Sequence, residues 1–156
     1  MKFSMDQIAL HIPLKNREHA FSLLKLLGII PSVEDEVLAE GTVVGQPTVN
    51  KALLSYNYTA LENAREFEVL TYTVGDNWMD TELNPAVSHF GMHVAEEELA
   101  LWREKLAPFA KVVQEVNTLR HTNPEIAGKR SYHYVIFGTR GLIGVDLKFI
   151  VRKVLE

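Results

Sequence analysis

One short segment occurs twice in this chain, about half a chain length apart. Residues 6–12 read DQIALHI and residues 88–94 read SHFGMHV, so that Gln7 falls on His89. Each position pairs residues of one class, in the order polar, polar, apolar, small, apolar, histidine and aliphatic. A repeat of this length indicates two copies of one supersecondary unit, because a solenoid needs at least about three shorter repeats.

Alternation within the two copies predicts β-strands and sorts their side chains onto two faces. Apolar side chains occupy one face and are expected to pack against helices: Ile8, Leu10, Phe90 and Met92. Polar side chains occupy the other face: Gln7, His11, His89 and His93. Each strand leads into a helical pattern, at residues 17–27 and 96–106, and Gly28 is expected to end the first helix.

Further strands are expected later in both halves, at residues 52–58, 66–73, 111–116, 132–137 and 142–151. The acidic residues 34–40 indicate a loop or a weak edge strand. We therefore expect one domain over residues 1–156, with halves at about 1–80 and 85–156. The stretch from Gly75 to Pro85 is rich in turn residues and is expected to connect the halves.

Composition excludes several classes of protein. The chain has no cysteine, which rules out a disulfide scaffold, a thiol nucleophile and a Cys-ligated zinc site. Its net charge of −4, with acids and bases mixed along the chain, predicts no nucleic-acid partner. No apolar run reaches the roughly 20 residues that a membrane span needs. Asp6 lies where a signal peptide would begin its apolar region, so we expect a cytoplasmic protein.

The two strand-helix units resemble those of the vicinal oxygen chelate superfamily, which includes glyoxalase I, bleomycin-resistance proteins and extradiol dioxygenases. Its halves open on a strand similar to Asp-His-Ile-Ala-Leu-x-Val and continue into a helix that ends near Leu-Gly, as at Leu27-Gly28. The resemblance implies an α+β fold in which two tandem βαβββ modules form a curved mixed sheet around a cavity, with the helices outside. The alternative is a ferredoxin-like or other α+β domain whose repeat is accidental.

The same resemblance implies a divalent metal held by one side chain from each of four strands: Gln7, Glu68, His89 and Asp146. The chain departs from the family pattern before the last of these, where Gly138-Thr139-Arg140-Gly141 replaces the usual Asp-Pro-x-Gly turn and the acid is Asp rather than Glu. One imidazole, one amide and two carboxylates suit Zn²⁺, Ni²⁺, Mn²⁺ or Fe²⁺. Such an ion would polarise a substrate oxygen, and His11 and His93 are candidates to move the proton.

Other residues are candidates to line the pocket. Lys148 shares a strand face with Asp146 by parity, and four more polar or aromatic side chains complete the set: His133, Arg130, Arg140 and Trp78. The expected function is a glyoxalase-like, metal-dependent lyase or isomerase acting on a small oxygen-bearing substrate. The alternative is a metal-free protein of the same fold that binds a small molecule or a peptide. Related folds pair about a two-fold axis, so a homodimer is also expected.

Overall fold

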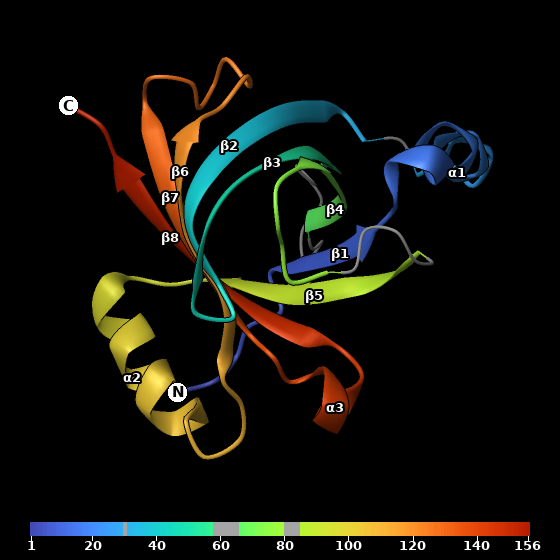
Figure 1. Ribbon diagram of the computed structural model, residues 1–156. Helices are drawn as coiled ribbons and strands as arrows, with labels where there is room; N and C mark the ends of the chain where they lie inside the picture. The colour runs from blue at the N-terminus through green and yellow to red at the C-terminus, as the bar shows by residue number, and fades with distance from the viewer. Residues whose placement is uncertain (30, 58–65, 80–84) are drawn as a thin grey trace.

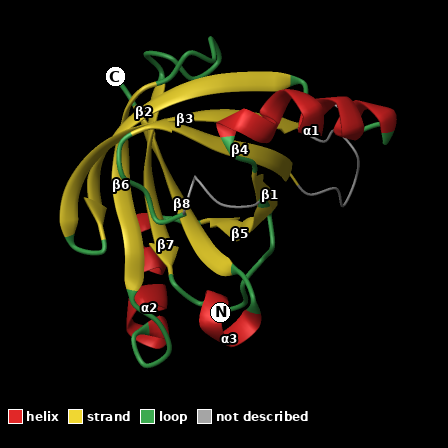
Figure 2. Cartoon of the chain, turned by 45° about the vertical axis from the view of Figure 1, so that its right-hand side comes forward, coloured by secondary structure: helices red, strands yellow, loops and turns green. Residues whose placement is uncertain are grey.

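The structure is a computed structural model that describes residues 1–29, 31–57, 66–79 and 85–156. Its strands close into one barrel in the order β1-β4-β3-β2-β6-β7-β8-β5 (Figure 1). The elements are β1 (Gln7–His11), α1 (Leu14–Leu26), β2 (Val33–Val43), β3 (Gln46–Asn57), β4 (Glu66–Val74), β5 (Ala86–His93), α2 (Glu96–Leu106), β6 (Val112–Arg120), β7 (Arg130–Phe137), α3 (Arg140–Ile143) and β8 (Asp146–Val154). The predicted α+β fold of two βαβββ modules around a cavity is confirmed, with the helices outside the barrel (Figure 2).

The two modules are built and joined in the same way. In each, the first strand runs parallel to the last, β1 beside β4 and β5 beside β8. Between them, β1 pairs antiparallel with β5, and β2 pairs antiparallel with β6. The barrel therefore closes only when both modules are present. The predicted connection between them lies partly outside the described residues.

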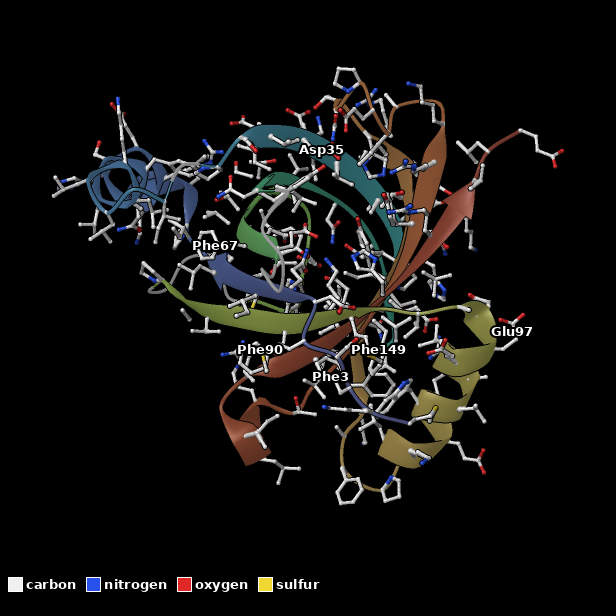
Figure 3. The ribbon with its side chains drawn as sticks, turned by 180° about the vertical axis from the view of Figure 1, so that it is seen from behind. Phe3, Asp35, Phe67, Phe90, Glu97 and Phe149 are labelled. Atoms are coloured by element: carbon white, nitrogen blue, oxygen red, sulfur yellow. The ribbon has the colours of Figure 1, made fainter. Side chains whose placement is uncertain are left out.

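The apolar faces of the two repeated strands pack outward under the two long helices. Leu10 of β1 packs against the cluster that contains Ile12, the residue after β1, and Leu24 of α1. Met92 of β5 is in another with Leu99 of α2, which Phe149 of β8 also joins. Figure 3 shows Phe149 beside Phe3 near α2, and their rings meet edge to face at 5.7 Å. Leu10 and Met92 thus pack against the helices as the period-2 pattern predicted.

Two local predictions differ from the structure. Residues 33–43 form a long strand between β3 and β6, not a loop or a weak edge, because Asp35, Val37 and Ala39 point inward while Glu34, Glu36, Leu38 and Glu40 alternate with them on the outer face. The high acid content masks this alternation in the sequence. Leu142 and Ile143 lie in the short helix α3 and not in the last strand, which begins only after Gly144 turns the chain at φ 80°.

The helix boundaries follow from local sequence. Pro13 precedes α1, and Gly28 follows its end at φ 77°, in the left-handed region that glycine adopts at little cost. Three glutamates occupy the first turn of α2, where the helix dipole favours negative charge. Within the described ranges, no helix combines the length and the apolar character that crossing a bilayer requires.

Candidate ligand site inside the barrel

A cavity of about 210 Å³ opens inside the barrel, near the start of β1 and the end of β8. Two oppositely charged residues of its lining, Glu68 and Lys148, are buried at 2% and 4% exposed, whereas Arg152 is exposed at its rim. The described residues that line it are Gln7, Asp35, Leu54, Tyr56, Glu66, Glu68, His93, Ile126, Tyr132, Tyr134, Lys148, Ile150 and Arg152. The site is therefore polar along β4, β1, β5 and β8, and aromatic along β7.

Gln7 connects the acidic side chains of β4 with the histidine of β5. Its Nε2 donates to Glu68 Oε2 at 2.8 Å and to Glu66 Oε1 at 3.0 Å. Its Oε1 then accepts from Nε2–H of His89 at 2.7 Å, which leaves the Nδ1 of that ring to accept from the hydroxyl of Ser88 at 2.9 Å. Burial, with the charges of Lys148 and Arg140, holds the pKa of His89 well below its usual value, so the ring is neutral.

Glu68 and Lys148 are two opposite charges in the buried part of the cavity. Burial raises the pKa of Glu68 to about 7, although the charge of Lys148 acts to lower it. Burial also lowers the pKa of Lys148, against the charges of Glu68 and Glu66. The Lys148 Nζ lies 3.9 Å from the centre of the Tyr134 ring, as a cation–π contact requires. Among described residues, Oε1 of Glu68 has no hydrogen-bond partner.

Strand register shows how the repeat places these groups. One row across four strands reads Glu66, Gln7, Gly91, Lys148, and the next reads Glu68, Ala9, His89, Asp146. The repeat superimposes β1 on β5 and β4 on β8. Because it places Gln7 on His89, it places the first row on the second row read in the opposite direction. It therefore relates Glu68 to Lys148, and Glu66 to Asp146. A lysine, and not an acid, is the counterpart of Glu68 in the second module.

Asp146, the predicted fourth ligand, lies at the other end of the barrel interior. Its Oδ1 accepts from the backbone N–H of Arg140 at 3.0 Å, and its Oδ2 accepts from that guanidinium at 3.3 Å. Its Oδ2 also accepts from the indole N–H of Trp78 at 2.9 Å. The same Arg140 donates to the backbone carbonyl of Ser88 at 2.6 Å. Arg140, Trp78 and Asp146 thus bind one another at the start of β8 and are not among the described residues that line the cavity.

The remaining predicted site residues are spread over the molecule. His93 is at the rim of the cavity, and its Nε2 lies 3.9 Å from Glu66. His11 is fully buried and is not among the residues that line the cavity. His133 is on the outer face of β7, where its two ring nitrogens lie 3.2 Å from Glu96 and 2.9 Å from Glu115, outside the cavity.

Arg130, at the start of β7, is likewise absent from the cavity lining. The predicted roles of these histidines and of Arg130 stay predictions. Their positions separate His93, which reaches the cavity, from His11, His133 and Arg130, which do not line it.

Several lining residues were not selected from the sequence. Glu66 and Arg152 share a strand face with Glu68 and Lys148 by simple parity, so alternation could have found both. Asp35 had no such signal, because its partners come from a distant loop. Its carboxylate accepts from His121 at 2.7 Å and from two backbone N–H groups of residues 122 and 123.

The four predicted ligands do not fit a divalent metal. In the described ranges, no group of three His, Asp or Glu side chains is placed to hold an ion. Gln7 and His89 satisfy each other, and Asp146 is paired with Arg140. Two cations, Lys148 and Arg140, are close enough to His89 to lower its pKa, and a nearby cation opposes binding of a second positive charge.

Comparisons with known proteins bear on the fold. No protein-family model matches the chain, and no curated protein sequence matches it either. The crystal structure of methylmalonyl-CoA epimerase from Mycobacterium tuberculosis is similar at a TM-score of 0.50 and 14% identity, over 97% of this chain and 91% of that one.

Two further structures align at lower TM-scores. A hypothetical protein from Bacillus halodurans aligns at 0.45 and 12% identity, over 98% and 96% of the two chains. Another methylmalonyl-CoA epimerase aligns at 0.44 and 13% identity, over 94% and 93%.

The barrel and its repeat define a protein of paired βαβββ modules with a polar cavity between them. This is the vicinal oxygen chelate fold, as the sequence resemblance predicted.

Proposed function

We propose that the barrel cavity binds a small polar molecule without a metal ion. The observation that carries this proposal is that Lys148 is the counterpart of Glu68 in the repeat. An ammonium there supplies a positive charge inside the barrel and repels a divalent cation. The unpaired Oε1 of Glu68 leaves one acceptor for a ligand, since buried polar groups are costly unless they are hydrogen-bonded.

The size of the cavity favours a small molecule over a peptide. Its volume of about 210 Å³ is below the roughly 300–1,000 Å³ typical of drug-sized ligand sites. A ligand of metabolite size fits this space. Tyr132 and Tyr134, stacked with ring centres 5.7 Å apart on β7, offer apolar surface beside the charged groups.

Elemental analysis and ligand screening together test the proposal. Untagged protein purified without chelators should contain no stoichiometric Zn, Ni, Mn or Fe, and a library of small polar molecules should raise its Tm with chelator present. K148M should lose the response to those ligands, and K153M, an exposed lysine of the same strand, should keep it. Near-stoichiometric metal that His89→Ala removes would instead contradict the metal-free site and support the metal-dependent lyase or isomerase.

An enzyme of the isomerase or lyase type is the second candidate. Glu68, with its pKa raised to about 7, suits a carboxylate that takes and returns a proton near neutral pH. The similar structure from M. tuberculosis is that of an epimerase. Incorporation of deuterium from D₂O into a bound ligand, abolished by E68Q, would support this candidate.

The expected homodimer also belongs to the proposal. Three leucines near the end of α1 are more than half exposed, namely Leu23, Leu26 and Leu27. Exposed apolar groups gathered on one element are typical of an interaction surface. Sedimentation equilibrium should detect a dimer that Leu26→Glu dissociates. A wild-type chain that stays monomeric at high concentration would remove the dimer from the proposal.

A further inference from the structure

We propose that the ligand of the barrel cavity is a zwitterion of about the size of a free amino acid, with its ammonium toward β4 and its carboxylate toward β8. The inference rests on the proposed function, that the cavity binds a small polar molecule, and names the chemical class of that molecule. It is carried by the separation of acidic and basic side chains onto two strands of one small cavity.

The charges that line the cavity are sorted by strand. Glu66 and Glu68 project from one face of β4 and form the acidic side, and Lys148 and Arg152 project from one face of β8 and form the basic side. Only β1 and β5 lie between these strands in the barrel order. At the level of Lys148, β5 contributes Gly91, which has no side chain to separate the two sides.

The inner charges of the two sides do not neutralise each other by contact. In the described ranges, no carboxylate lies within ion-pair distance of Lys148, whose ammonium instead faces the Tyr134 ring at 3.9 Å. Oε1 of Glu68 has no hydrogen-bond partner there. Oε1 of Glu68 and the ammonium of Lys148 are both buried without an ion-pair contact among the described residues, which is costly, and a molecule that bridges them supplies both interactions.

The balance of charge favours a zwitterion over a simple anion or cation. Asp35 is also in the lining, but its carboxylate is already occupied by His121 and two backbone N–H groups. Two acids, Glu66 and Glu68, then face Lys148 and Arg152, and the neutral or charged ring of His93 lies at the rim, 3.9 Å from Glu66. An anion would leave Glu68 unpaired beside it, a cation would do the same to Lys148, and only a ligand with both charges satisfies both sides.

The other side chains that line the cavity form an apolar surface for the side chain of the ligand. Tyr132 and Tyr134 stack nearly parallel, at 18°, and Ile126 and Ile150 complete an apolar cluster with them. An apolar or aromatic group packs on such a surface while its charged end meets the strands. An amino acid with an uncharged side chain therefore matches the cavity better than one with a third charge.

Calorimetric titration of the full-length protein with matched probes tests this inference. Each standard amino acid is titrated beside its N-acetyl derivative, which keeps only the carboxylate, and its amide, which keeps only the ammonium. At least one free amino acid should bind about tenfold or more tightly than both derivatives, because leaving one buried charge unpaired costs at least that much. This comparison needs no variant and does not depend on how any variant folds.

Two variants assign the charges to their sides. K148M should lose the preference for the free amino acid over its amide, and E68Q should lose the preference over its N-acetyl derivative. K153M and E40Q are exposed charges on β8 and β2 and should keep wild-type affinities. Circular dichroism melts confirm that each variant is folded.

The possible failures are distinguishable. An N-acetyl derivative or an amide that binds as tightly as the free amino acid would overturn the zwitterion and leave a small-molecule site in place. If no amino acid binds while neutral polar fragments do, the zwitterion is again overturned and the proposed function stands. If no probe of either kind binds, both fail.

Discussion

Gly91 is the residue whose missing side chain makes room for the polar network of the cavity. A Cβ built there would lie 3.0 Å from Gln7 Oε1 and 3.1 Å from Gln7 Cβ. Gln7 would have to move, and its hydrogen bonds to Glu68 and His89 would be strained. The glycine in the repeated motif, small like its counterpart Ala9, therefore has a packing reason.

We predict that Gly91→Ala lowers the free energy of unfolding by about 1–3 kcal/mol, the usual cost of an extra methyl group in a close-packed site. Urea denaturation measures it. Gly141→Ala is the matched control, because a Cβ at that position meets nothing within 4 Å and the residue is exposed. Equal stability of the two variants would show that Gln7 moves aside at no cost.

Glu68 should make stability depend on pH in an unusual direction. Its pKa is about 7 in the folded state against 4.5 when unfolded, so between these values the folded protein binds more protons than the unfolded one. Stability should then fall as pH rises from about 4.5 to about 7 and level off above, by about 3–4 kcal/mol at roughly 1.4 kcal/mol per pKa unit.

Urea denaturation of wild type and E68Q across that range, without ligand, isolates the contribution of this carboxyl. The difference between the two proteins should change with pH, in favour of the wild type at low pH. A difference that stays constant would show that Glu68 titrates normally. The test is independent of the ligand and of the proposed function.

At the scale of elements, the loop between β6 and β7 is held to β2 by the carboxylate of Asp35 and by a hydrogen bond from the backbone N–H of Glu36 to Thr122 Oγ1 at 2.8 Å. Asp35 accepts from Nδ1–H of His121 at 2.7 Å and from the backbone N–H groups of Thr122 and Asn123 at 2.8 and 3.0 Å. Figure 3 shows Asp35 on β2 at the edge of the barrel. Ile126 of the same loop lines the cavity, so this contact also positions part of the site.

We predict that Asp35→Asn destabilises the protein by about 2–3 kcal/mol, because an amide cannot accept from all three donors and leaves one buried and unsatisfied. Hydrogen exchange at the amides of Thr122 and Asn123 should quicken. Glu36→Gln on the same strand removes only a surface ion pair with Lys51 and should cost less than about 1 kcal/mol. If both variants lose the same small amount, the loop is held by other contacts.

The elements differ in how far the sequence could predict them. β1, β5 and the two long helices follow from period-2 and helical spacing, because their apolar faces are complete. β2 could not be predicted in this way, since its glutamates obscure the alternation. Leu142 and Ile143 were predicted to lie in a strand because apolar residue type alone does not distinguish a short helix from a strand.

The site was only partly predictable for a related reason. Parity places Gln7, Glu68 and Lys148 on inner faces, but the register between strands decides which of them meet. That register depends on pairing between segments about 60 residues apart, which no local pattern records. The observed register makes Lys148, and not the predicted Asp146, the counterpart of Glu68.

At the scale of the whole molecule, the barrel leaves neither module complete by itself. Separating them would open the β1–β5 and β2–β6 pairs and expose four strand edges. The cavity would also be lost, since Glu68 comes from one module and Lys148 from the other. The expectation of a single domain over residues 1–156 stays a prediction, and this architecture leads to a direct test.

We predict that the chain unfolds in one cooperative transition, because neither module keeps a closed sheet without the other. The two tryptophans report on different parts: Trp78 follows β4 and its ring contacts Tyr72 of the first module and His89 of the second, so it reports on their junction, whereas Trp102 lies in α2 of the second module. In Trp102→Phe the fluorescence follows Trp78, and in Trp78→Phe it follows Trp102. Within each variant, the urea midpoint from fluorescence should coincide with that from far-ultraviolet circular dichroism.

Trp78→Phe also removes a hydrogen bond to Asp146, so its midpoint should be lower for both probes together. Separate midpoints for the two probes within one variant would mean that the modules unfold independently, and the cavity would then be an interface between two domains.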